Sequence, residues 1–292
     1  MTSHSNAKDK SVANLPLRYD PFLNFDMQYR PGVNNNKTGK IRREFTMKLV
    51  ARFGLISPSN IAWLYGISHR QSLEHLNKLV QEQLLCLVTT HRSHDGRVYT
   101  LTYSGAKYAE ELLNVAVYYR AKEHPALQVN QNTLMHDLIM QFVLLKGIHH
   151  HKPNGEPNPL WCAMMTEPEF KRRFTHSSVR NVDGIVREVD GTICAVEMEH
   201  SFKTKAARQT ILLKWHDGIG QGYYDKVMLF SQSLHIFSDI KRLHEQLYEE
   251  LTTRPDKKTR QPLLTAQDAA SLKQRIIYRT LLCDELTERF YR

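Results

Sequence analysis

Apolar positions recur with a helical period between residues 40 and 83, and this pattern predicts three helices. The first apolar stripe has i, i+4 spacing and consists of Ile41, Phe45, Leu49 and Phe53. Gly54 then suits a helix C-cap, and a short second helix is expected from Pro58, a residue tolerated in a first turn. The third helix follows the N-cap residue Ser68, and its apolar stripe consists of Leu73, Leu76, Leu79 and Val80.

Two β-like runs, LLCLVTT and VYTLTY, follow around the polar segment HRSHDGR. Three helices and then a β-hairpin is the order of a winged helix-turn-helix domain. Its third helix would read base edges or phosphates in a DNA major groove through the polar residues His69, Arg70, Gln71, Glu74 and Lys78. Arg92 and Arg97 in the hairpin would then reach a nearby phosphate or the minor groove. The alternative is a winged helix that contacts only proteins.

The apolar pattern changes to short β-like runs between residues 160 and 237. Asp190-Gly191 is a strong hairpin turn between two of these runs, 181–189 and 192–199. A helix over 204–217 and another strand over 223–231 predict a strand-helix-strand crossover, which implies a parallel pair. Two further helices are expected, over about 239–252 and about 266–290.

Charge and composition narrow the class of protein. The chain has 292 residues and a net charge of +10. The segment 40–100 holds nine Lys and Arg but four Asp and Glu, and such a basic segment favours a polyanionic partner, most often nucleic acid. The chain has no run long enough to span a membrane and no secretory signal, and its four cysteines are widely separated in sequence. We therefore expect a cytoplasmic protein without membrane insertion.

Candidate chemistry lies where the apolar run Ile193-Cys194-Ala195-Val196 leads into Glu197-Met198-Glu199. Residues alternate sides along a strand, so Glu197 and Glu199 point the same way, and two buried carboxylates are costly unless they are paired or bind a cation. A register about the 190–191 turn brings Asp183 near residue 198. Three carboxylates at one sheet edge suit Mg²⁺ or Mn²⁺, which predicts a metal site of Asp183, Glu197 and Glu199. A solvated Glu-x-Glu edge is the alternative interpretation.

An acidic residue, a hairpin and then Glu-x-Glu before a helix resembles the PD-(D/E)xK nuclease core. The resemblance implies that Asp183 and Glu197 bind a divalent metal for phosphodiester cleavage. The proline that precedes the aspartate in that family is Val182 here, and Glu199 occupies the lysine position. The lysine role would therefore move to Lys203 or Lys205.

A winged helix, a helix containing LMHDLIMQ and a nuclease-like core together resemble the MobC-type plasmid relaxases and related replication-relaxation proteins. This resemblance spans about 40–235 and implies nicking of one DNA strand at an origin of transfer, with His136 and Asp137 near the site. It also implies a nicked or single-stranded product and a mobilisation accessory or coupling protein as partners. A DNA-binding regulator with a catalytically silent nuclease-like domain, and a restriction or repair nuclease, are the alternatives.

The expected fold class is α+β or α/β, with a winged helix-turn-helix followed by a restriction-endonuclease-like mixed sheet flanked by helices. The expected domains are a flexible N-terminal arm over 1–39, the winged helix-turn-helix over 40–125, and the nuclease-like domain with C-terminal helices over 126–292. Tyr223 and Tyr224 are candidate nucleophiles or, alternatively, packing aromatics.

Overall fold

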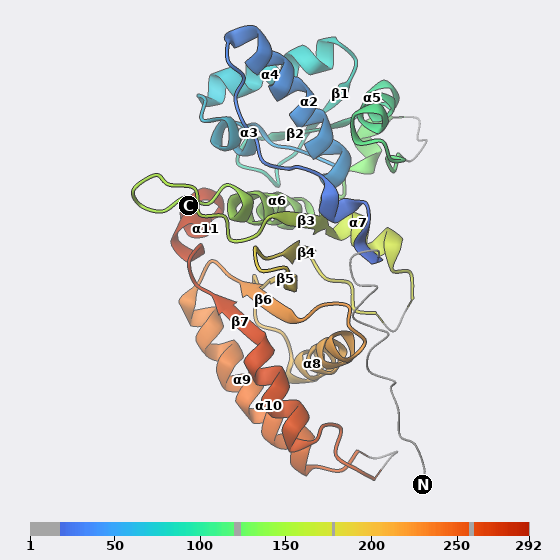
Figure 1. Cartoon of the computed structure of the whole chain (residues 1–292), viewed down its shortest axis with the longest axis vertical. Coiled ribbons are helices and arrows are strands. Elements are labelled where there is room, and N and C mark those ends of the chain that lie inside the picture. Colours follow the sequence, from blue (N-terminus) through green and yellow to red (C-terminus); the bar gives the residue numbers. More distant parts are fainter. Residues whose placement is uncertain (1–17, 120–123, 177–178, 257–259, 292) are drawn as a thin grey trace. The chain divides into compact units, whose positions relative to one another are not determined.

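The computed structural model describes residues 18–119, 124–176, 179–256 and 260–291 (Figure 1). The architecture is α+β, with a mixed sheet and a small antiparallel sheet. The chain divides into two compact units. The helix–hairpin unit comprises Phe25–Glu169, and the sheet unit comprises the described residues up to Asn24 together with those from Phe170 onward.

The helix–hairpin unit begins with three helices and a hairpin. Its elements are α2 (Asn35–Phe53), α3 (Pro58–Tyr65), α4 (His69–Gln81), β1 (Leu85–Thr89), β2 (Arg97–Leu101), α5 (Tyr103–Leu113), the 3-10 helix η3 (Pro125–Gln128), α6 (Leu134–Ile148) and β3 (Ala163–Thr166). Strands β1 and β2 pair antiparallel. The order of three helices and then a hairpin agrees with the order expected from the apolar pattern.

Local caps explain where these helices start and stop. Ser57 and Ser68 accept hydrogen bonds from the backbones of α3 and α4, and Gln71 completes a capping box at the start of α4. Gly54 ends α2 at a φ of 86°, which is the left-handed region that favours glycine. The sequence signals for these ends are therefore confirmed.

Side-chain hydrogen bonds tie α6 into the helix–hairpin unit. The Asn60 side chain of α3 donates to the Leu138 carbonyl at 3.1 Å and to the Gln141 side chain at 2.8 Å. Further along the chain, the buried Arg52 guanidinium donates to Glu169 at 2.8 and 2.9 Å. These contacts lie within Phe25–Glu169, and the domain boundary expected at 125 and 126 stays a prediction.

The sheet unit holds four strands in the order β4-β5-β6-β7. Its elements are η2 (Phe22–Asn24), β4 (Gly184–Arg187), β5 (Ile193–Met198), α8 (Lys205–Gly220), β6 (Lys226–Phe230), α9 (Leu234–Thr253), α10 (Ala266–Arg275), β7 (Ile276–Arg279) and α11 (Cys283–Phe290). Helix α7 (Glu167–Arg173) contains the division between the two units. Strands β4 and β5 are antiparallel, whereas β5, β6 and β7 run parallel to one another.

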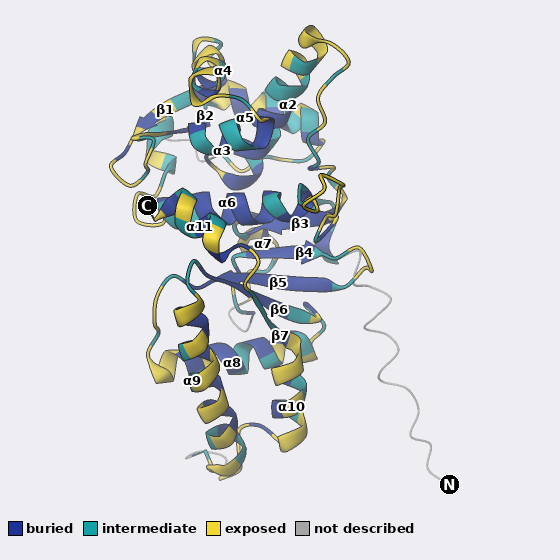
Figure 2. Ribbon diagram, turned by 90° about the vertical axis from the view of Figure 1, so that its left-hand side faces the viewer, coloured by how far each residue is buried: buried dark blue, intermediate teal, exposed yellow. Residues whose placement is uncertain are grey.

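The predicted hairpin and crossover explain this topology. Gly191 turns the β4–β5 hairpin at a φ of 92°, and α8 connects β5 to its parallel neighbour β6. Every residue of β5 is buried, which agrees with an inner strand covered on both faces. Helices α8, α9 and α10 lie on one side of β5, β6 and β7 (Figures 1 and 2). In the described part of the chain, no helix combines the length and apolarity needed to cross a membrane.

Two expectations about the chain ends differ from the structure. The single helix expected over 266–290 is α10, β7 and α11, because Ile276 continues as a strand beside β6. Residues 1–17 of the expected arm over 1–39 lie outside the described residues. The rest of the arm makes specific contacts: Tyr19 is buried and donates to the Tyr223 carbonyl, and Asn34 caps α2 five residues before Gly39.

Candidate functional site

Glu197 on β5 and Glu199, directly after this strand, face helix α8. Glu197 is 3% exposed and Glu199 is fully buried. Glu197 accepts a hydrogen bond from Trp215 of α8, and Glu199 accepts two from Arg208 of the same helix. The two carboxylates therefore lie on the same side of the strand, as the alternation of side chains predicts.

Glu197 is held by an arginine from outside the strand. Arg180, which precedes β4, donates its Nε to Oε1 at 2.6 Å and its Nη2 to Oε2 at 2.7 Å. Trp215 donates its indole N–H to Oε1 at 3.1 Å. This bidentate pair satisfies a charge that would otherwise be buried without a partner.

The protonation of Glu197 depends on its burial and its neighbours. Burial and, next, the nearby Asp183 carboxylate raise the pKa of Glu197 to about 7, while Arg180 and Trp215 oppose the change. A carboxyl group with a raised pKa keeps its proton to a higher pH than an ordinary glutamate does. This property is common in catalytic carboxyls and also arises in buried ion-pair networks.

Glu199 is paired more completely than Glu197. Arg208 donates Nη1 to Oε1 at 2.8 Å and Nη2 to Oε2 at 3.0 Å, and the Lys203 ammonium also donates to Oε2. Burial alone would raise the pKa of Glu199, but the hydrogen bonds and charges of Arg208 and Lys203 outweigh it and lower the pKa. Glu199 is therefore ionised, and it pairs with both Arg208 and Lys203.

Asp183 lies next to Glu197 across the β4–β5 hairpin. Gly184 pairs with Val196, so the register places Asp183 opposite Glu197, and its Oδ2 accepts a hydrogen bond from the Met198 N–H at 2.8 Å. The sequence placed residue 183 near residue 198, one position further along. The predicted neighbourhood of Asp183 and Glu197 thus exists in the sheet unit.

The donor set tests the predicted site for Mg²⁺ or Mn²⁺. Each carboxylate oxygen has about two accepting positions, and such metals need several oxygen ligands. Both oxygens of Glu199 accept from Arg208, and Oε2 accepts also from Lys203, while Oε1 of Glu197 accepts from two donors. In this arrangement the three carboxylates do not fit a shared metal. A metal shared by these three carboxylates stays a prediction, and it requires the arginine side chains to move.

The two lysines proposed for the catalytic role have different positions. Lys203 donates to Glu199 and is one third exposed, so it lies at the carboxylates. Lys205 is the first residue of α8 and donates instead to Glu250 of α9 at 2.5 Å. The structure therefore brings only Lys203, of these two, to the glutamates of β5.

The remaining candidate residues lie in α6 or directly before β6. His136 and Asp137 lie in the first turn of α6, where Asp137 accepts from the Thr133 hydroxyl at 3.0 Å. Because α6 is in the helix–hairpin unit, their place beside the carboxylates stays a prediction. Tyr224 is buried and the Tyr223 ring packs against the Phe174 ring, which favours packing over a nucleophile role.

The polar residues expected to read DNA lie on the exposed side of α4 (Figure 2). The exposed set is His69, Arg70, Gln71, Glu74 and Lys78. Arg70 pairs with Glu74 at 3.0 Å with both side chains largely in solvent. The Gln71 carbonyl oxygen serves the capping box, which leaves its amide N–H groups for other partners.

The hairpin loop is tied to the start of α3 and α4 by one carboxylate. Asp95 accepts from the Ser59 backbone N–H and hydroxyl, and it contacts His69 Nε2 at 2.8 Å. Arg92 on the same loop and Arg97 at the start of β2 are exposed. The loop cations and the first turn of α4 are thus held in one connected group, and His69 is engaged by Asp95.

Two arginines that neutralise the carboxylates were not foreseen from the sequence. Arg208 gave a usable signal, because it falls on the same face of α8 as the buried residues Ile211, Leu212 and Trp215. A lone charge on an apolar helix face needs a buried partner. Arg180 gave no such signal, since it precedes β4 in an irregular segment whose contacts depend on the tertiary fold.

No protein-family model, curated protein or solved structure with which the chain was compared matches it. The interpretation of the site therefore depends on its own geometry.

Proposed function

We propose that this chain is a DNA-binding protein that recognises a specific duplex sequence with α4. The observation that carries the proposal is the exposed first turn of α4, where Arg70 is 89% and His69 52% exposed in their side chains. A short helix, a turn and a second helix followed by a hairpin is the arrangement of a winged helix-turn-helix domain. In that arrangement the N-terminal part of α4 would enter the major groove.

The chemistry of these side chains suits the two tasks of a DNA reader. An arginine can donate two hydrogen bonds to a guanine edge, and a glutamine can pair with an adenine edge. Arg70 and Gln71 supply these groups from α4, while Lys78, Arg92 and Arg97 supply exposed charge for phosphates. The Arg70–Glu74 pair is exposed, so Arg70 can leave Glu74 and bind a DNA base at little cost in free energy.

A selection of binding sites from a random duplex pool tests this function. We expect the purified chain to enrich a consensus and to bind it, in fluorescence anisotropy, at least 100-fold more tightly than a scrambled duplex. Lys78→Gln should weaken both duplexes equally and reduce the slope of log affinity against log salt by about 1. A pool that remains random after repeated rounds would contradict the proposal.

Strand nicking at an origin of transfer is the second candidate function, and the observation that favours it is the position of Asp183 beside Glu197. Under this hypothesis the chain would be a plasmid relaxase whose cofactor is Mg²⁺ or Mn²⁺. The arginine pairs of Glu197 and Glu199 favour the alternative, a DNA-binding regulator with a silent nuclease-like sheet. As paired with these arginines, Glu197 and Glu199 do not offer a shared metal site.

Cleavage of a supercoiled plasmid separates the two candidates. A relaxase should convert a plasmid carrying its own origin to the open circle when Mg²⁺ or Mn²⁺ is added, and Glu197→Gln should abolish this conversion while duplex affinity changes less than threefold. A regulator should leave the plasmid supercoiled at every metal concentration. Intact nicking in the Glu197→Gln variant would remove Glu197 from the catalytic role.

A further inference from the structure

A pocket in the sheet unit is lined by cations next to Arg180. Its volume is about 580 Å³, and its lining includes Lys171, Phe174, Arg180, Asn181 and Lys214. None of the described side chains that line it is a carboxylate. Two lysines and the Arg180 that pairs with Glu197 thus line one hollow, whose described lining side chains include no carboxylate.

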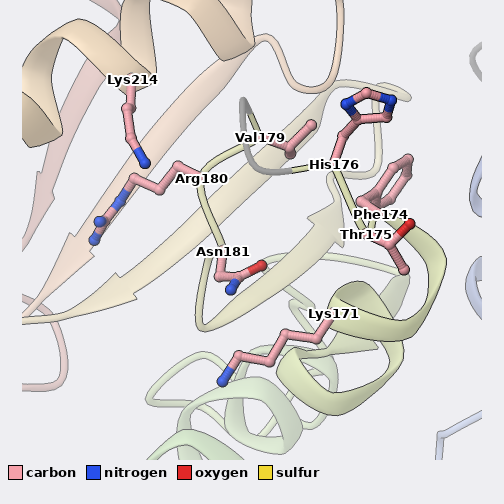
Figure 3. Close-up of a pocket in the computed structure, with 8 residues that line it drawn as sticks. All are labelled: Lys171, Phe174, Thr175, His176, Val179, Arg180, Asn181 and Lys214. Atoms are coloured by element: carbon pink, nitrogen blue, oxygen red, sulfur yellow. The ribbon is translucent and has the colours of Figure 1, made fainter.

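The three cations come from three different parts of the unit (Figure 3). Lys171 extends from α7, Lys214 extends from α8, and Arg180 and Asn181 lie between them on the segment before β4. Lys214 is half-buried, whereas Lys171 and Asn181 are exposed, so the pocket is open to a ligand from solvent. The fold therefore gathers these charges from positions that are distant in sequence.

This arrangement favours an anion with several oxygen atoms. Lysine ammonium groups attract phosphate as point charges, and asparagine donates a directional hydrogen bond through its amide. A concave surface that carries one sign of charge raises the local concentration of the opposite ion. Because the wall contains no carboxylate, a metal cation is disfavoured and a phosphate is favoured.

The size of the pocket and its apolar wall favour a ligand larger than inorganic phosphate. A volume of this order matches sites for small organic ligands, which range from about 300 to 1,000 Å³. The half-buried Phe174 ring and the Val179 side chain form an apolar part of the lining. Aromatic rings offer a surface on which a nucleic-acid base can stack.

We infer that this pocket binds one nucleotide unit of a nucleic-acid strand, with its phosphate between Lys171 and Lys214 and its base or sugar toward Phe174. The inference rests on the proposed function for the kind of ligand, a DNA strand. The charges of the lining indicate a phosphate, and the volume of the pocket indicates a ligand of nucleotide size, without reference to that function.

Arg180 connects this pocket to the carboxylates of β5. Its two hydrogen bonds to Glu197 use two of the five N–H groups of a guanidinium. Glu197 thereby fixes the plane of Arg180 at the wall of the pocket, as a positioning residue. A phosphate bound there would lie next to the arginine that neutralises Glu197.

Calorimetric titration of the full chain with thymidine 3′,5′-bisphosphate tests the inference. We expect binding that weakens at least tenfold in the double variant Lys171→Gln, Lys214→Gln. Lys273→Gln is the control for a lysine outside the pocket, because it removes one charge from an exposed position on α10, and its affinity should stay within twofold of the wild type. Equal losses in the control and in the pocket variants, or no binding by the wild type, would overturn the inference.

Two further arms identify the ligand and separate this inference from the proposed function. The bisphosphate should displace a fluorescein-labelled single-stranded 12-mer, and inorganic phosphate should bind at least tenfold more weakly than the bisphosphate. Failure of either result would overturn the assignment to a nucleotide unit of a strand. Arg70→Ala should weaken duplex binding and leave bisphosphate binding unchanged, so loss of duplex recognition alone would count against α4 and not against the pocket.

Discussion

Removal of Arg208 tests the interpretation of the β5 carboxylates as members of buried ion pairs. Arg208 is 1% exposed, and Glu199 has no exposed surface. Replacing Arg208 with methionine keeps most of the side-chain volume but takes away both hydrogen bonds to the Glu199 carboxylate. The variant leaves a buried charge with Lys203 as its remaining cation partner in the described structure.

The expected cost follows from this burial. Removing one partner of a buried ion pair costs about 3–5 kcal/mol, and Lys203 keeps one oxygen paired, so we expect a loss of about 3 kcal/mol for Arg208→Met. The Arg208 Nε has no hydrogen-bond partner among the described residues, so the native pair is not fully satisfied. The double variant Glu199→Met, Arg208→Met should therefore be more stable than the wild type, or less stable by no more than about 1 kcal/mol.

Hydrogen exchange of the β5 amides, followed by mass spectrometry, measures this cost within the sheet unit. Lys205→Gln is the control, because it removes a half-exposed lysine paired with Glu250 and should change the opening free energy by less than about 1 kcal/mol. If Arg208→Met changes the opening free energy as little as Lys205→Gln does, the buried Arg208–Glu199 pair does not stabilise the sheet unit.

Two further predictions concern the helix–hairpin unit. A Cβ on Gly147 would lie 2.0 Å from the Trp161 ring, so Gly147→Ala should lower the midpoint of thermal unfolding by several degrees. Gly39 in α2 has open space around it, so the control Gly39→Ala should raise this midpoint slightly. Burial, helped by nearby cations, lowers the pKa of His75 to about 4, so its contribution to stability is present above about pH 6.5 and is lost as the pH falls through 4. In urea denaturation, the unfolding free energy of the wild type should therefore fall between pH 7.5 and pH 5 by on the order of 1–2 kcal/mol more than that of His75→Gln. Equal falls in the two proteins would exclude this role of His75.

Local patterns predicted much of the fold. The apolar stripe from Ile41 to Phe53, the N-cap Ser68 and the Asp190-Gly191 turn were sufficient because each signal depends on residues close in sequence. The same patterns missed β7, since Ile276 and its neighbours follow a helix directly and become a strand only by pairing with β6. The hydrogen bond between α6 and Asn60 gave no local signal, because Asn60 lies about 80 residues earlier.

The candidate site shows the same limit. The cost of burying Glu197 and Glu199 was evident from the strand pattern, and it correctly indicated that cations must be near. The sequence did not reveal that these cations are guanidinium groups, because Arg180 and Arg208 reach the strand only in the tertiary structure. The pocket between Lys171 and Lys214 could not be predicted either, since its lining comes from three separate segments.

The central claim is that α4 reads base pairs through Arg70. The most direct test measures the affinity of wild type and Arg70→Ala for the selected duplex and for every single base-pair substitution of it, at one fixed salt concentration. We predict that the wild type loses about 1–3 kcal/mol at the base pair that Arg70 reads, and that Arg70→Ala loses this discrimination at that position alone. Equal weakening of Arg70→Ala on all duplexes, with the pattern of discrimination unchanged, would contradict the claim.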